Sequence, residues 1–278
     1  MLSESKIIAL YCIVDDMLKS IRHREDIRVR VSDSEVITTA FISSLYFGGH
    51  LDHARCFMKI KGYVPRMLNK SRFCRRLHRL SDLLVTMFFQ LGKNLKDMAG
   101  ASDYQLDSFP VEVCDNIRIA RCKLFKAKRF RGKHAAMRRY FYGVRVQVLT
   151  LQGIPVEFCL VPGSEADVFA LNKLPFDVAP ESHIYMDSAY SDYLSEDDLF
   201  EAEMIHAMVQ RKSNYTRKDE PHVSFLKQHM RKQIENTFSQ IKAKMLRHIH
   251  AVTPKGFLLK VNMFIIAFSF EKITGNLS

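Results

Sequence analysis

Three carboxylates in the sequence stand out because of the residues around them. Asp107 lies in the apolar segment YQLDSFPVEVC, where a buried charge would need a cation or hydrogen-bond donors. Asp187 directly follows the apolar run HIYM, at the end of an expected strand. Glu235 lies in RKQIENTFSQIK, one residue after Ile234. These three residues are far apart in sequence, so only the fold could bring them together.

Three carboxylates in one site repel one another unless divalent cations offset their charge. Their hard oxygen ligands favour Mg²⁺, or Mn²⁺ in its place, over zinc. Two such ions would stabilise the attacking and leaving oxygens of an in-line displacement at phosphorus. We therefore interpret Asp107, Asp187 and Glu235 as candidate catalytic and metal-binding residues that act on a DNA or RNA backbone.

Two basic residues share a predicted helix face with Glu235. Arg231, Glu235 and Lys242 are spaced by four and seven residues, so all three side chains project from one side of an α-helix. Arg231 and Lys242 would then flank a phosphate held at Glu235. The alternative is an exposed Arg–Glu pair at i,i+4, which stabilises a helix by only about 0.3–0.5 kcal/mol.

The charge balance points to a polyanionic partner. The 278 residues contain 42 Lys and Arg against 30 Asp and Glu, which gives a net charge of +12 and a pI near 9.4. Nucleic acid is the leading candidate. A membrane is the competitor, but the most apolar stretch, residues 257–270, contains Lys260 and is shorter than the roughly 20 residues that span a bilayer. It predicts a buried helix.

Two segments concentrate the positive charge. Residues 55–79 hold nine Lys or Arg and no Asp or Glu, including Arg72, Arg75 and Arg76, and we interpret this surface as one that faces phosphates. A solvated helix face is the alternative. Residues 118–145 hold eleven more, including Lys133 and Arg145, and would guide DNA to the acidic site. A mobile, solvated loop is the alternative there.

The first hundred residues are expected to be helical, since apolar residues recur every three or four positions. Helix starts are predicted at Ser3, at Ser32, which forms a capping box with Glu35, and at Ser71, which precedes Phe73, Leu77, Leu80 and Leu84.

After Gly100 the pattern predicts strands and then helices again. Strands are expected at 104–109, at 141–151 and 156–161 as an antiparallel hairpin, at 183–186 and at 204–209. Helices are expected at 166–174, 194–202 and 223–246, with Asp167 as a residue that starts a helix rather than a ligand. This order predicts a mixed α/β fold, with a mixed sheet flanked by helices behind an all-helical N-terminal region.

Several other functions lack a motif. The sequence contains no P-loop, no GxGxxG and no GxSxG, so nucleotide hydrolysis, dinucleotide binding and serine-esterase chemistry have no support. The six cysteines are scattered without a CxxC pair, and no secretory signal is evident at the N-terminus. We expect a reduced, cytoplasmic protein.

The chain resembles the DDE transposases of bacterial insertion sequences over nearly its whole length. The segments that carry the resemblance are VSDSEVITTAFISSLYFGG, NKSRFCRRLHRL, LDSFPVEVC, YFYGVRVQVLTLQGIPVEFCLVPGSEADV, IYMDSAY, RKQIENTFSQIKAK and KGFLLKVNMFIIAFSF. Any one of them is weak, but their shared order is specific. On the last core helix, Arg231, Glu235 and Lys242 fit the family's Tyr-Arg-Glu-Lys spacing, whereas Gln228 occupies the expected Tyr position.

The resemblance implies an RNase H-like core with a five-stranded mixed sheet. It implies a helical DNA-binding domain at residues 1–100 and a catalytic domain with a C-terminal helix at residues 101–278. Asp107 would bridge two Mg²⁺ ions, and Asp187 and Glu235 would each complete one ion's shell. The enzyme would cut DNA at the ends of the insertion sequence, acting as an endonuclease, and then join the 3′-hydroxyl to target DNA.

The resemblance also implies partners: terminal inverted repeats, target DNA, and a second copy of the chain, because two ends must be paired. The protein would act in the bacterial cytoplasm, in association with the nucleoid. Two alternatives stay open at this point. One is a metal-dependent nuclease on the same core, and the other is a non-catalytic DNA-binding protein derived from a transposase.

Overall fold

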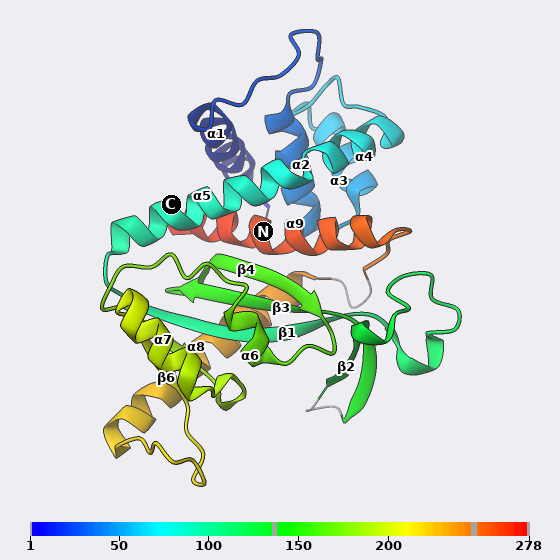
Figure 1. Cartoon of the computed structure of the whole chain (residues 1–278). Helices are drawn as coiled ribbons and strands as arrows, with labels where there is room; N and C mark the ends of the chain where they lie inside the picture. The colour runs from blue at the N-terminus through cyan, green and yellow to red at the C-terminus, as the bar shows by residue number, and fades with distance from the viewer. Residues whose placement is uncertain (1, 135–137, 246–248, 277–278) are drawn as a thin grey trace. The chain divides into compact units, whose positions relative to one another are not determined.

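The computed structural model of the chain describes residues 2–134, 138–245 and 249–276 (Figure 1). Contacts divide it into two compact units, residues 1–88 with 241–278, and residues 89–240. The two boundaries fall inside the helices α5 (Ser81–Ala99) and α8 (Pro221–Lys244). The discontinuous first unit is called the helical unit below, and the second the sheet unit.

The helical unit is built from the N-terminal helices and the last helix of the chain. Besides its parts of α5 and α8, its described elements are α1 (Glu4–Ser20), α2 (Asp33–Tyr46), α3 (Leu51–Ile60), α4 (Lys70–Arg79) and α9 (Pro254–Asn276). This confirms the expected helical character of the N-terminal region.

Side-chain caps explain where these helices begin. Ser3 caps α1, and the capping box of Ser32 and Glu35 is present at the start of α2, as predicted. The predicted start at Ser71 is wrong by two residues, because the Asn69 side chain accepts a hydrogen bond from Arg72 N at 2.9 Å and begins α4. The helix α4 also ends at Arg79, before Leu80. The apolar residues predicted on one helix, from Phe73 to Leu84, are therefore divided between α4 and α5.

The core of the helical unit forms around α9. Phe257, Val261, Ile265 and Phe268 of this helix are almost fully buried, which confirms the expected buried helix. The Phe41 ring of α2 packs against the Phe270 ring, with centroids 5.1 Å apart. Over the described part of the chain, no helix has the length and apolar character needed to cross a membrane.

The sheet unit follows the predicted alternation of strands and helices. Its elements, besides parts of α5 and α8, are β1 (Asp103–Asp115), η1 (Asn116–Arg118), η2 (Lys128–Phe130), β2 (Arg131–His134), β3 (Arg139–Leu151), β4 (Ile154–Pro162), α6 (Asp167–Leu171), β5 (His183–Met186), η3 (Ser188–Tyr190), α7 (Tyr193–Glu203) and β6 (His206–Val209). The strand β2 was not predicted from the sequence.

One mixed sheet organises this unit. Its strands run in the order β2-β3-β1-β5-β6, and β4 pairs with β3. The β3–β4 hairpin is antiparallel, as predicted, while β1 pairs in parallel with β5 and β5 with β6. The mixed α/β class and a fold consistent with an RNase H-like core are therefore confirmed. The sheet has six strands rather than five, because the short β2 extends it along the beginning of β3.

The two faces of β1 have different neighbours. Phe109 packs edge-on against Phe238 of α8, with ring centroids 5.0 Å apart, and Gln105 contacts Gln233 of the same helix. Because side chains alternate along a strand, Asp107 shares this face with Gln105 and Phe109. Residues of the opposite face, such as Leu106, belong to a core cluster with the strand β3.

The contact units do not coincide with the expected domains at residues 1–100 and 101–278. α9 packs with the N-terminal helices, and the sheet unit begins within α5. The two units reflect which residues pack together and do not assign functions to the parts of the chain. The DNA-binding and catalytic roles expected for the two parts of the chain stay predictions.

Within the sheet unit, α5 approaches β4 closely at Gly92. A Cβ atom added there would lie 2.1 Å from the carbonyl oxygen of Val156, far inside any normal contact. Because that oxygen belongs to the backbone, the contact cannot be relieved by a change of side-chain rotamer. The helix–sheet packing therefore requires glycine at this position.

We predict that Gly92→Ala lowers the free energy of unfolding by about 1–3 kcal/mol or more, since the added methyl group must push α5 away from β4. Urea unfolding followed by circular dichroism measures the change. Gly275→Ala in α9 is the matched control, because a Cβ there meets no atom of the described residues within 4 Å. Wild-type stability of Gly92→Ala would show that the close approach is absent in solution.

Candidate active site

The register of the parallel strands brings Asp107 and Asp187 together. Leu106 of β1 is paired with Met186 of β5, and Met186 is paired with Val209 of β6. The next residues are therefore neighbours at the same edge of the sheet, and they include Asp107 and Asp187. Neighbouring strands lie about 4.8 Å apart, so two carboxylates from positions 80 residues apart in sequence meet at this edge.

The helix α8 contributes cations to this edge. Arg231 and Lys227 line a small pocket together with Asp107 and Asp187. The buried Lys227 ammonium donates to Val209 O at 2.9 Å and to Asp219 Oδ1 at 2.6 Å. It thus fixes α8 to the end of β6, which places Arg231 one helical turn further along, beside the two carboxylates.

Burial raises the pKa of both carboxyl groups. The pKa of Asp107 rises to about 7, mainly because the group is desolvated and further because of the charges of Asp187 and Asp167. The Ser108 N–H, which donates to Asp107 Oδ1 at 2.7 Å, and the charge of Arg231 act in the opposite direction. Desolvation also raises the pKa of Asp187, whose Oδ1 accepts from Ala189 N at 2.7 Å.

Glu235 lies on the same helix but has a different partner. Its carboxylate accepts from Arg231 Nε at 3.0 Å, and its side chain is 55% exposed. Among the described residues, the carboxylates of Asp107, Asp187 and Glu235 do not form a group whose oxygens all lie within 4.8 Å of one another. The structure thus brings two of the three predicted residues together, and Arg231 connects Glu235 to them.

The donor set at this edge fits a hard divalent cation. Two desolvated carboxylates with raised pKa values offer oxygen ligands, and a cation between them would offset their repulsion. Glu235 can join them only by exchanging its ion pair with Arg231, because its carboxylate is held there. The residues that could hold such an ion are therefore Asp107 and Asp187, with Glu235 as a third ligand after that exchange.

Sequence reasoning missed a further carboxylate near the pair. Asp167 begins α6, as predicted, but it also accepts two hydrogen bonds from Arg145 at 3.1 and 2.9 Å and one from Gln147 at 2.8 Å. Its charge contributes to the raised pKa values of Asp107 and Asp187. No local pattern marks this role, because its donors come from β3, about 20 residues earlier.

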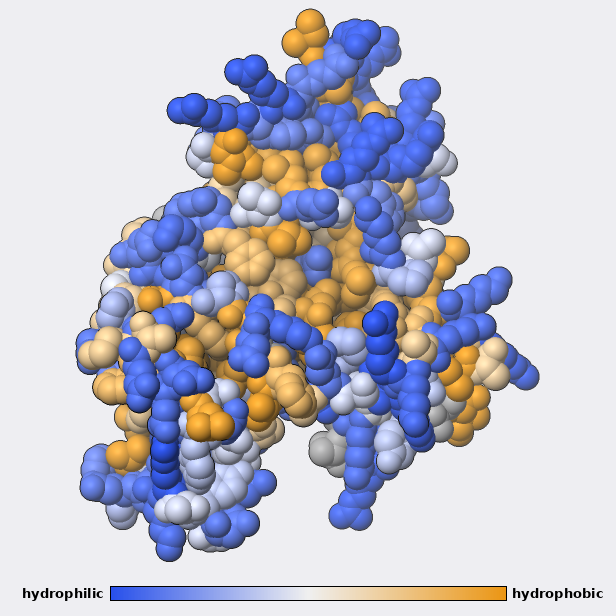
Figure 2. Space-filling view, in the orientation of Figure 1, coloured by the Kyte–Doolittle hydropathy of each residue, from blue (hydrophilic) through white to orange (hydrophobic). Residues whose placement is uncertain are grey.

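The basic residues predicted to bind DNA occupy several places. Lys133 is exposed on β2, whereas the Arg145 guanidinium is bound to Asp167 and donates to Lys133 O. Lys242 is exposed near the end of α8, in the part of that helix that belongs to the helical unit. Figure 2 shows hydrophilic side chains projecting from the region of β2.

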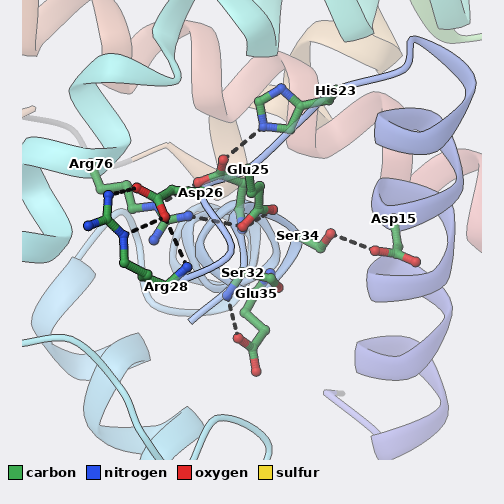
Figure 3. Close-up of polar contacts among 10 residues, drawn as sticks. Asp15, His23, Glu25, Asp26, Arg28, Ser32, Ser34, Glu35 and Arg76 are labelled. Carbon is green, nitrogen blue, oxygen red and sulfur yellow. Dashed lines mark hydrogen bonds and ion pairs between the residues drawn. The ribbon is translucent and has the colours of Figure 1, made fainter. Parts of the chain in front are cut away.

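On α4, the three predicted arginines do not share one environment. Arg72 and Arg75 are exposed, and the Arg75 side chain donates to Ser71 O at 3.3 Å. Arg76 is 19% exposed and forms ion pairs with Asp33 at 2.6 Å and Glu25 at 3.1 Å (Figure 3). Its guanidinium therefore holds α4 to the start of α2 within the helical unit.

The same network contains a group that geometry alone would suggest for a metal ion. Ligand atoms of His23, Glu25 and Asp33 all lie within 4.8 Å of one another. Arg76 already donates to both carboxylates, and His23 bonds to Asp33 Oδ2 at 2.8 Å. Since a protein cation compensates this cluster, we interpret it as an ion-pair network that stabilises the helical unit.

Comparison with known families identifies one match. A family model described as a transposase DDE domain matches residues 78–252, which is more than half of the chain. Neither the curated proteins nor the solved structures contain a significant match to the chain. The matched range includes Asp107, Asp187 and Glu235.

We predict that Asp107→Asn stabilises the metal-free protein more at pH 8 than at pH 5. The folded-state pKa of Asp107 is raised from 3.8 to about 7, so between these values the folded protein holds a proton that the unfolded chain releases. The free energy of unfolding of the wild type therefore falls as the pH rises through this range. Asparagine removes the ionisation, and we expect a gain of roughly 1–3 kcal/mol at pH 8.

Urea unfolding in EDTA at the two pH values measures this difference. Asp198→Asn, which replaces an exposed carboxylate on α7, is the control. An equal effect of Asp107→Asn at both pH values would contradict the raised pKa.

Proposed function

The chain belongs to the transposase DDE domain family, and from this premise we propose that it is a DNA transposase that cuts at the ends of an insertion sequence and joins the freed 3′-hydroxyl to target DNA. The observation that carries this proposal is the meeting of Asp107 and Asp187 at the carboxyl edge of the parallel strands, beside Arg231. We propose that the protein acts in the bacterial cytoplasm on terminal inverted repeats and target DNA.

In this proposal, Asp107 and Asp187 hold divalent cations, Mg²⁺ or Mn²⁺, and Glu235 provides the third carboxylate. When bound, such ions lower the pKa of water and stabilise the charge that develops on phosphate oxygens. The two desolvated aspartates would otherwise repel each other, which supports a cation as their natural partner.

Arg231 has two roles in the proposed reaction. It compensates the charge of Asp107 and Asp187 and pairs with Glu235 at 3.0 Å. Once Glu235 turns toward the aspartates, the guanidinium is released and can bind a phosphate of the DNA in a bidentate manner. Lys242, two turns after Glu235 on α8, would bind a neighbouring phosphate.

DNA binding is proposed to use exposed cations of both units. Arg72 and Arg75 on α4 and Lys133 on β2 are exposed, which suits contacts to a phosphate backbone. Arg76 would support this surface indirectly, by fixing α4, and Arg145 would support the site through Asp167. Two ends of the element must be joined in one reaction, so we propose a homodimer on DNA.

We predict that Asp107→Asn, Asp187→Asn and Glu235→Gln each abolish DNA cleavage while DNA affinity stays within a few-fold of the wild type. These changes remove the charge that binds the metal ions but keep the size of the side chain. Cleavage of a supercoiled plasmid that carries the element ends, and gel shift with the same ends, measure the two properties. Asp198→Asn is the control and should cleave normally.

Cleavage at the wild-type level by any one of the three variants would refute the role of that residue. The products decide between the proposed reaction and simple hydrolysis. A transposase joins element ends to a second plasmid, whereas a nuclease yields only cut ends.

We also predict that affinity for DNA falls steeply with salt and that Arg72→Ala/Arg75→Ala reduces the slope. Each phosphate contact contributes about 0.9 to the slope of log K against log salt concentration, so the double variant should lower it by about 1.8. Fluorescence anisotropy at KCl concentrations from about 50 to 300 mM measures the slope.

Arg28→Ala is the matched control for this pair. The Arg28 side chain is 86% exposed, but it already forms an ion pair with Asp26. An unchanged slope in the double variant, or an equal change in Arg28→Ala, would contradict a specific phosphate contact by α4.

A further inference from the structure

Buried and half-buried polar side chains form a connected network near the two aspartates, and it consists of Tyr190, Gln147, Asp167 and Arg145. The Tyr190 hydroxyl donates to Gln147 Oε1, and Gln147 Nε2 donates to Asp167 Oδ1 at 2.8 Å. Arg145 Nη1 donates to both oxygens of Asp167. The side chains of Tyr190 and Gln147 are fully buried. We call this set the Tyr190 network.

On β3, the polar residues of this network follow apolar residues of the same face. Leu149 and Leu151 on the same face of β3 belong to the hydrophobic core cluster, together with Leu106 of β1. Gln147 and Arg145 continue that face toward the sheet edge that carries the aspartates. A buried polar group destabilises the fold unless it is hydrogen-bonded, so leucine at position 147 would need no such compensation. The hydrogen bonds of the Tyr190 network instead restrict its members to one geometry.

The network joins the two chain segments that carry the aspartates. Tyr190 is the last residue of η3, the short helix that begins directly after Asp187, and Tyr190 N donates to Asp187 O at 3.2 Å. Gln147 is paired with Ser108, the residue after Asp107. Through Gln147, the Tyr190 side chain thus connects the turn of Asp187 to β3, which pairs with the strand of Asp107.

Asp167 adds an electrostatic effect to this connection. Its carboxylate is occupied by Arg145 and Gln147, so it is not a ligand for an ion at the aspartates. Its negative charge still raises the pKa of Asp107 and Asp187, as the desolvation of these two groups also does. A further negative charge near the two aspartates strengthens the attraction of this site for a cation.

We propose that the Tyr190 network consists of positioning residues that set the separation of Asp107 and Asp187 and thereby the affinity of this pair for a divalent cation. This rests on the proposed function, because it assumes that the two aspartates bind the ion. The network would act as the outer layer of hydrogen bonds that orients metal ligands in many sites.

The test compares two tyrosine-to-phenylalanine variants of the full-length protein. Tyr190→Phe removes the hydroxyl that bonds to Gln147. Tyr104→Phe removes a hydroxyl that is equally buried in the same sheet but has no hydrogen-bond partner among the residues that the structure describes, so it is a matched control. Mn²⁺ binding to metal-stripped protein is measured by isothermal titration calorimetry and by electron paramagnetic resonance of free Mn²⁺.

We expect Tyr190→Phe to bind Mn²⁺ about 10–100-fold more weakly than the wild type, and Tyr104→Phe to bind it normally. DNA affinity in EDTA should be the same in all three proteins. Cleavage by Tyr190→Phe should recover as the Mn²⁺ concentration is raised, which damage to the fold would not allow. Equal Mn²⁺ affinity of Tyr190→Phe and the wild type would overturn the proposal.

Asp167→Asn provides a second, independent test in case Tyr190→Phe fails to fold. Asparagine keeps an oxygen acceptor for Gln147 but removes the charge, and we expect weaker Mn²⁺ binding with a normal circular dichroism spectrum. Failure of the proposed function looks different from failure of this inference. If the proposed function is wrong, Asp107→Asn leaves the Mn²⁺ binding of the wild type unchanged, or the wild type binds no Mn²⁺. If only this inference is wrong, Asp107→Asn abolishes Mn²⁺ binding, but the variants of the Tyr190 network bind Mn²⁺ as well as the wild type.

Discussion

Repulsion between two desolvated carboxylates is the constraint that explains the surroundings of the site. The pairing of Leu106 with Met186 leaves Asp107 and Asp187 side by side at the end of parallel strands. Each of them is easier to protonate than an ordinary aspartate, chiefly because of its burial. The neighbouring cations and hydrogen-bond donors oppose this effect. They include Arg231, the Ser108 N–H and the Ala189 N–H.

The helix α8 places a compensating cation beside the two aspartates from one face of the sheet. Phe238 packs on Phe109 and fixes the helix along β1, while Lys227 fixes its first half to the end of β6. Arg231 lies between these two anchors, within reach of both the aspartates and Glu235. Its ion pair with Glu235 is exposed, so its net contribution to stability is small and the pair can exchange readily.

Much of this arrangement could be predicted from the sequence, because it depends on local patterns. Apolar runs that end in an aspartate located Asp187, and helical spacing placed Arg231 and Glu235 on one face. The i,i+4 Arg–Glu pair that the sequence left as an alternative is present in the structure. The strand β2 was missed because its sequence, RGKH, shows no apolar alternation and is ordered by pairing with β3.

Contacts between distant parts of the chain could not be predicted in this way. Arg76 looked like one of several arginines on a basic helix, but its partners Asp33 and Glu25 lie 43 and 51 residues earlier. Asp167 likewise has the pattern of a helix start, and only the fold places Arg145 and Gln147 against it. In both cases the local sequence pattern already explains the polar residue. Its partner in the folded protein is distant in sequence, so the spacing of residues does not reveal it.

The discontinuous helical unit has a consequence for synthesis of the protein on the ribosome. Its core includes α9, at the C-terminal end of the sequence, whereas the sheet unit is contiguous from residue 89 to 240. Domains generally fold in the order in which they are translated. Here the first helices to leave the exit tunnel must wait for the last one, so the sheet unit can finish folding first. A nascent chain that stalls before residue 254 would carry α2 without the helix that covers it.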